Sequence, residues 1–163
     1  MEILIVGVIV VALMVYASTR IKRSAAAAFD AETVTENDFV VEKPEGFLHV
    51  LNGKGSYLFE TYSKDFGTED NRNVRLGRAY LTSSSEAPSS SDDRTDERTE
   101  VIDDIHYQIF AGSHVEKDAS FVDQSKIAEH NGRYYEFRTI RLIEASDDFS
   151  AKLEAMLDSF RLK

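Results

Sequence analysis

The sequence predicts an α+β protein, with an antiparallel β-sheet packed against two amphipathic helices and preceded by a single N-terminal transmembrane helix. Three observations support this prediction. Residues 3–19 carry no charge, and three of the next four residues are basic. Several short segments with strand-like composition follow, separated by turn residues, and strands joined by short turns are antiparallel. Two later segments, residues 99–112 and 146–163, place apolar residues at helical spacing.

Residues 1–23 are expected to form a transmembrane anchor with a basic flank. A helix over residues 3–19 would be about 26 Å long, against about 30 Å for the core of a bilayer. Arg20, Lys22 and Arg23 follow this stretch and can extend to anionic lipid headgroups. A cleavable signal peptide carries its positive charge before the apolar stretch, so an uncleaved anchor is favoured. The positive-inside rule places the C-terminal domain in the cytoplasm, with an extracytoplasmic domain as the alternative.

Residues 24–37 are expected to form a linker that is first helical and then polar. The run SAAAAF prolongs the first helix, because alanine has the highest helix propensity. The run DAETVTEND then reads as a short polar connector. A soluble α+β domain is expected over residues 38–163, which is the usual size of a single domain.

The first half of this domain is expected to contain strands over residues 39–42, 56–63 and 74–82. The sequence Pro-Glu-Gly at residues 44–46 predicts a turn after the first strand. Gly77, within the third strand, indicates a bulge or a close approach of another segment. Residues 83–98 are rich in Ser and Asp and contain no large apolar residue, which predicts an exposed, mobile loop.

The second half of the domain is expected to form a helix, a hairpin and a final helix. Residues 99–112 place four apolar side chains on one helical face: Val101, Ile102, Ile105 and Ile109. The Asn131-Gly132 pair predicts a tight turn between strands over residues 126–130 and 133–143. Ser146 is a candidate N-cap for the last helix. An apolar stripe follows it, made of Phe149, Leu153, Met156, Leu157 and Phe160.

The composition argues against several classes of function. The formal net charge is −10, and because the first 23 residues contribute +2, the remainder carries −12. A domain this acidic is repelled by phosphate groups, so nucleic-acid binding is not expected. The chain has no cysteine, which excludes disulfides, thiolate catalysis and Cys-ligated metals.

No motif assigns a catalytic residue, a cofactor or a metal. The four histidines stand at positions 49, 106, 114 and 130, and none of these spacings is typical of a zinc site. Adjacent acidic pairs are explained by helix capping and solvation. An enzyme would need a pocket formed by residues distant in sequence, for which Glu60, Arg78, His106 and Arg138 are possible members.

Three local patterns occur in the order expected for a known family. They are a strand leading into a Pro-x-Gly-aromatic turn (FVVEKPEGF), an Asn-Gly-Arg turn leading into an aromatic strand (NGRYYEF), and a closing helix that ends in Ser-Phe (KLEAMLDSFRL). In these patterns residues 38–163 resemble the PsbP-like superfamily of small bacterial and chloroplast domains. The resemblance implies an antiparallel sheet between helices, with no catalytic residues to carry over. It also implies an accessory, assembly or binding role.

The function expected from the sequence is that of a single-pass membrane protein presenting a non-catalytic α+β module for binding or assembly. Its expected partners are a lipid bilayer, through residues 3–19, and another protein. Two alternatives stay open: a membrane-tethered enzyme with an unrecognised pocket, and a structural subunit of a membrane complex.

Overall fold

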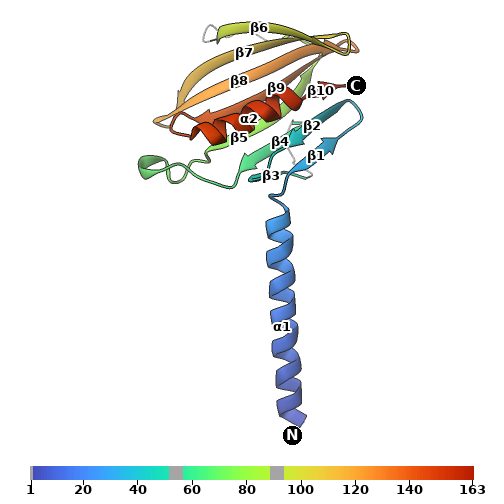
Figure 1. Ribbon diagram of the computed structural model, residues 1–163, viewed down its shortest axis with the longest axis vertical. Coiled ribbons are helices and arrows are strands. Elements are labelled where there is room, and N and C mark those ends of the chain that lie inside the picture. Colours follow the sequence, from blue (N-terminus) through green and yellow to red (C-terminus); the bar gives the residue numbers. More distant parts are fainter. Residues whose placement is uncertain (1, 52–56, 89–93) are drawn as a thin grey trace.

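In the computed structural model, which describes residues 2–51, 57–88 and 94–163, ten strands form two antiparallel sheets (Figure 1). The larger sheet has seven strands in the order β3-β4-β5-β9-β8-β7-β6, and the smaller has three in the order β1-β2-β10. The strands are β1 (Glu32–Thr35), β2 (Phe39–Lys43), β3 (Phe47–His49), β4 (Phe59–Ser63), β5 (Gly77–Ser84), β6 (Arg94–Ile102), β7 (Ile105–Glu116), β8 (Ala119–His130), β9 (Arg133–Leu142) and β10 (Arg161–Leu162). The helices are α1 (Glu2–Ala27), the 3-10 turn η1 (Glu69–Asn71) and α2 (Asp147–Ser159).

The described chain is therefore mostly β, and the predicted packing of one sheet against two amphipathic helices is wrong. The helix expected over residues 99–112 is instead the end of β6 and the first part of β7. Asp103 and Asp104 have φ angles of 51° and 63° and form the two-residue turn between these strands. Aspartate tolerates this left-handed conformation, which hairpin turns of this kind require. Along β7, Tyr107 and Ile109 are buried while His106 and Gln108 are exposed, which is the period of a strand.

The N-terminal segment forms a helix, and α1 continues through the alanine run to Ala27 as predicted. Its role as a transmembrane helix was wrongly predicted: among the described residues, no helix has both the length and the apolar character needed to cross a membrane. The uncharged stretch is 17 residues long, against about 20 for a typical span. Figure 1 shows α1 projecting away from both sheets, and its side chains from Ile9 to Ala27 are exposed.

The segment that joins α1 to the sheets is held by buried contacts. Strand β1 lies within the expected polar linker and pairs with β2, with Val34 opposite Val41. Lys43 is almost fully buried, and its Nζ donates hydrogen bonds to the carbonyl oxygens of Phe47, at 2.9 Å, and of Asp30. Because burial disfavours the ammonium ion, it lowers the pKa of Lys43, although Glu32 and Asp30 oppose this. These contacts connect the end of α1 to the core.

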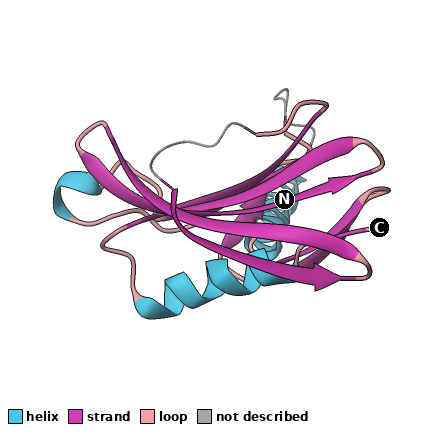
Figure 2. Cartoon of the chain, turned by 90° about the horizontal axis from the view of Figure 1, so that it is seen from above, coloured by secondary structure: helices cyan, strands magenta, loops and turns pink. Residues whose placement is uncertain are grey.

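Helix α2 lies along one face of the large sheet (Figure 2) and also packs against β2 of the three-stranded sheet. It begins as predicted, because the Ser146 side chain accepts a hydrogen bond from the backbone N–H of Phe149 at 3.3 Å. The predicted apolar stripe is buried along its whole length. Its last member, Phe160, stacks on Phe137 of β9 with ring centroids 5.1 Å apart. The main core therefore lies between the large sheet, α2 and the small sheet.

Local turn signals are confirmed at two further places. Gly46 ends the Pro-Glu-Gly turn with φ = 92°, and Asn131 and Gly132 join β8 to β9 with φ angles of 53° and 71°. The loop predicted over residues 83–98 is shorter than expected, because its first two residues extend β5 and residues 94–98 belong to β6. Its centre, residues 89–93, lies outside the described residues.

Candidate functional site

The candidate site lies on the face of the seven-stranded sheet that points away from α2, here called the outer face. A Cβ atom added to Gly77 would lie 2.8 Å from the ring of Phe149 of α2, so Gly77 faces α2. The next residue, Arg78, must point to the opposite face because side chains alternate along a strand. Arg78 pairs with Tyr62 on one side and with Ile140 on the other. These side chains therefore form one row across β4, β5 and β9.

A cleft of about 440 Å³ opens on the outer face. Its lining combines the apolar side chains of Val74, Phe121 and Ile140 with the tyrosine Tyr62, the amide of Asn73 and four charged residues. The charged residues are Arg75, Arg78, Glu116 and Lys117. Ile140 is only 2% exposed, so the cleft reaches down to the sheet itself. Clefts of this size, with apolar surface and a few polar groups, are typical of small-ligand sites.

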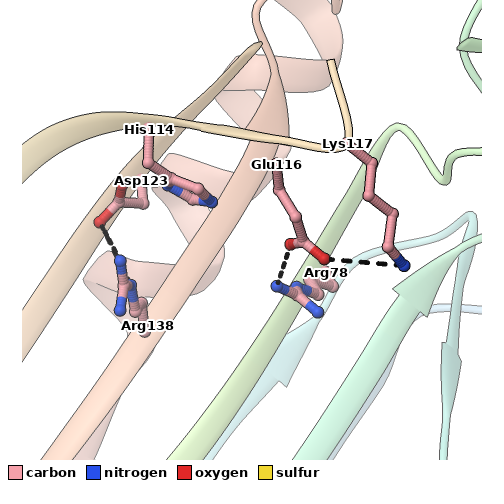
Figure 3. A network of polar contacts seen from close by, with 6 residues as sticks. All are labelled: Arg78, His114, Glu116, Lys117, Asp123 and Arg138. Atoms are coloured by element: carbon pink, nitrogen blue, oxygen red, sulfur yellow. Dashed lines mark hydrogen bonds and ion pairs between the residues drawn. The ribbon is translucent and has the colours of Figure 1, made fainter. Parts of the chain in front are cut away.

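The hairpin between β7 and β8 places Glu116 at this cleft. Lys117 and Asp118 have φ angles of 50° and 68° and form a tight two-residue turn. A carboxylate oxygen of Glu116 lies 3.7 Å from Arg78 and another lies 4.0 Å from Lys117 (Figure 3). Strands β5 and β7 are separated by two others, or roughly 14 Å in a flat sheet. The Glu116–Arg78 contact therefore joins strands that do not pair, through two long side chains that reach toward each other over the outer face.

A second polar cluster lies beside the cleft and is internally satisfied. Asp123 is 9% exposed and accepts two hydrogen bonds from the Arg138 guanidinium, at 2.7 and 3.2 Å (Figure 3). Its other oxygen lies 3.1 Å from Nδ1 of His114, whose ring stacks on Phe121. Burial alone would lower the pKa of Arg138, but its interactions with Tyr80 and Asp123 raise it. Because its charges are paired, this cluster supports the wall of the cleft.

Tyr62 is a cleft residue whose hydroxyl is held by a neighbouring carboxylate. The hydroxyl donates a hydrogen bond to Oε1 of Glu60 at 2.6 Å. This hydrogen bond, with burial as a smaller cause, raises the pKa of Tyr62 to about 12. The phenol is therefore protonated at neutral pH and can act there as a polar contact.

We expect Tyr62 to lower the stability of the protein in strong alkali. Since its folded pKa of about 12 lies above the ordinary value of 10.0, its contribution to stability is complete below pH 10 and is lost as pH rises to about 12. Tyr62→Phe should reduce the loss of unfolding free energy between these pH values, measured by urea unfolding. The control variant is Tyr16→Phe, which makes the same substitution at an exposed position on α1, away from both sheets. An equal loss in Tyr62→Phe and wild type would contradict the prediction.

The residues singled out from the sequence lie in different parts of the structure. Arg20, Lys22 and Arg23 are exposed on α1, and their predicted contact with lipid and the predicted sidedness stay predictions. Glu60, Arg78 and Arg138 all lie on the outer face. Tyr80 is two residues from Arg78 on β5 and therefore points to the same face. The strand register places Glu60 and Arg138 on either side of Tyr80.

The fourth member of the hypothetical enzyme pocket, His106, is not brought together with the others. Arg138 is opposite Ser125, which is opposite Phe110 of β7. His106 lies four residues from Phe110, or roughly 13 Å further along the strand. Among the described residues, no three His, Asp or Glu side chains are grouped so that they could hold a metal ion.

Sequence reasoning missed the two cleft residues at the β7–β8 turn, Glu116 and Lys117. The cause was the wrong helix over residues 99–112, which removed β7 from the expected sheet. The sequence does contain a signal for this hairpin. Lys117-Asp118 separates two segments in which apolar and polar residues alternate, just as Asn131-Gly132 does. Aspartate is one of the residues that tolerate the left-handed conformation of such turns.

Comparisons with known proteins bear on the fold. No model of a protein family matches the sequence, and no curated protein matches it either. The solution structure of cyanobacterial PsbP (CyanoP) from Synechocystis sp. PCC 6803 is similar in fold, with a TM-score of 0.55 and 12% sequence identity. The likeness covers 83% of this chain and 94% of that one.

A second solved structure, from Bacteroides thetaiotaomicron VPI-5482, gives a TM-score of 0.49 at 14% identity over 77% of this chain and 45% of that one. That likeness is too weak to support a statement about the fold. The likeness to cyanobacterial PsbP, together with the arrangement of strands and α2, shows that this chain has a PsbP-like fold.

Proposed function

We propose that this protein is a non-catalytic binding or assembly module, and that the cleft on the outer face receives its ligand or a side chain of its partner. The observation that carries the proposal is the cleft itself. It is about 440 Å³ in volume, reaches the buried Ile140, and is bordered by charges at its mouth. Apolar surface provides affinity in such a site, and a few placed polar groups provide orientation.

The chemistry of the cleft favours binding over catalysis. General acid–base catalysis works best with groups whose pKa lies near the working pH. Tyr62, with a pKa of about 12, is far from that range. Asp123 is held between Arg138 and His114, where it orients neighbouring side chains. The groups at the cleft are therefore suited to contact a ligand.

Blocking the cleft should abolish binding to it. Asn73 is exposed and lines the cleft, so Asn73→Trp places a large ring in its mouth without disturbing the core. A library of small neutral aromatic compounds should give saturation-transfer NMR signals with the wild-type protein. We expect these signals to fall at least about fivefold in Asn73→Trp, because the ring occupies the volume that the compounds use.

The matched control is Arg72→Trp, because Arg72 is exposed in the same loop and does not line the cleft. It should keep the signals of the wild type. Equal signals from Asn73→Trp and Arg72→Trp, or a library without any bound compound, would reject the cleft as a binding site.

A further inference from the structure

We propose that the cleft is selective for small carboxylates that carry an apolar group, with Arg78 receiving the carboxylate and Phe121 and Ile140 contacting the apolar part. This inference rests on the proposed function and names the chemical class of the ligand.

The charge of the cleft is opposite to that of the domain around it. Three cations line the cleft, Arg75, Arg78 and Lys117, against the single anion Glu116. The remainder of the chain after residue 23 has a formal charge of −12. A local excess of positive charge attracts anions and disfavours cations of the same shape. The ligand that complements this lining is therefore negatively charged.

Two of the nearby arginines are occupied by contacts within the protein. Arg75 donates hydrogen bonds to the carbonyl oxygens of Ser63 and Lys64, at 2.8 and 3.0 Å, and lies over the ring of Phe66. Arg138 binds Asp123 through two nitrogen atoms. Both guanidinium groups therefore serve the structure, and neither is the natural receptor for a ligand.

Arg78 is in a different situation. Its contact with Glu116 is 3.7 Å long, which exceeds the length of a hydrogen bond, and both side chains are almost half exposed. An incoming carboxylate can take the guanidinium without breaking a hydrogen bond to Glu116. Since the guanidinium is planar and presents parallel N–H groups, it matches the two oxygens of a carboxylate.

Glu116 keeps a partner when Arg78 turns to a ligand. Lys117 lies 4.0 Å from the other carboxylate oxygen of Glu116, and its side chain is 88% exposed and free to adjust. The weak Arg78–Glu116 contact can therefore give way to a ligand while Glu116 stays near Lys117.

The apolar lining of the cleft explains why the ligand should carry an apolar group. Ile140 is buried and Phe121 is half-buried, and both lie in the cleft beside Tyr62. A carboxylate without an apolar group would contact only the mouth of the cleft. An aromatic or branched apolar group would also displace water from these side chains, which adds binding free energy.

Isothermal titration calorimetry with four probes tests this selectivity. The probes are phenylacetate, its neutral amide phenylacetamide, the cation phenethylamine, and acetate, which lacks the ring. We expect phenylacetate to bind at least about tenfold more tightly than each of the others, because hydrogen bonds to charged groups and ring burial each contribute substantially. Arg78→Gln should weaken phenylacetate by about tenfold and leave phenylacetamide unchanged.

The matched control is Arg72→Gln, which removes an equal charge from an exposed position outside the cleft lining, and it should bind phenylacetate as the wild type does. If phenylacetate, the amide and the amine bind equally, and all three lose binding in Asn73→Trp, the selectivity is rejected and the proposed function stands. Phenylacetate binding that survives in Asn73→Trp would reject both. An absence of binding by phenylacetate would reject the selectivity for apolar carboxylates.

Discussion

Glu100→Gln should lower the free energy of unfolding by about 3 kcal/mol, whereas Lys126→Met should change it by less than about 1 kcal/mol. Lys126 lies on β8 with its side chain fully buried, and its Nζ is 2.5 Å from Oε1 of Glu100 on β6. The ring of Tyr107 also faces this nitrogen, at 4.6 Å from the ring centroid. Removing the carboxylate leaves a buried ammonium ion without its anion, which is strongly destabilising.

Lys126→Met has a small effect because Glu100 is the more exposed partner of the pair. Its side chain is 34% exposed, so the carboxylate, whose Oε1 is buried against Lys126, can turn toward water when the ammonium ion is removed. Methionine has nearly the length of lysine and fills the same apolar space without a charge to desolvate. Urea unfolding followed by circular dichroism measures both variants. A larger loss in Lys126→Met than in Glu100→Gln would contradict this account, and Lys117→Met, at an exposed position, is the control.

The same pair contributes to the pH dependence of stability. Burial lowers the pKa of Lys126 below its ordinary value of 10.5, although the nearby carboxylate of Glu100 opposes this shift. Between the lowered pKa and 10.5 the unfolded chain binds more protons, so this lysine makes the unfolding free energy rise with pH. In Lys126→Met this contribution should be absent, which distinguishes the loss of the charge from a change in packing.

Gly77→Ala should lower the free energy of unfolding by about 2 kcal/mol, because it forces α2 away from the large sheet. The added Cβ would lie 2.8 and 2.9 Å from two ring atoms of Phe149 and 3.0 Å from the carbonyl oxygen of Ile140. The ring cannot simply move aside, since it stacks on Phe47 with centroids 5.4 Å apart. The loss should be measurable by thermal and urea unfolding.

Two further variants test whether this loss is steric. In Gly77→Ala combined with Phe149→Leu, the smaller side chain leaves room for the methyl group, so the two losses should be less than additive. Gly132→Asn is the control: no atom lies within 4 Å of its Cβ position, and asparagine tolerates its φ of 71°. If the double variant loses the full sum of the two single losses, the methyl group does not act through Phe149.

Much of the fold could be predicted wherever a local pattern determines the backbone. The Asn131-Gly132 turn, the Ser146 cap and the apolar stripe of α2 are all confirmed. These features depend on residues only a few positions apart, through the left-handed preference of Asn-Gly and the hydrogen bond of a serine cap. Gly77 was also identified correctly as a position of close approach, although its neighbour Phe149 could not be named.

The same local reasoning failed where one segment fits both the helical and the strand periodicity of apolar residues. In residues 99–112 the apolar positions satisfy a helical spacing, yet β7 alternates buried and exposed side chains. Helix and strand patterns overlap in short segments, and the strand is decided by its pairing with β8, through partners such as Tyr107 and Ala128. Such pairing joins residues about twenty positions apart and leaves little trace in the segment itself.

The sequence by itself determined the acidic charge of the chain, the helical N-terminal segment, the tight turns and the capped final helix, because each depends on composition or on neighbouring residues. Only the tertiary structure decided where the cleft lies. Tyr62, Arg78, Glu116 and Ile140 meet there from four strands. The order of the strands and their register bring these side chains together, and both result from long-range pairing and packing that no local pattern encodes.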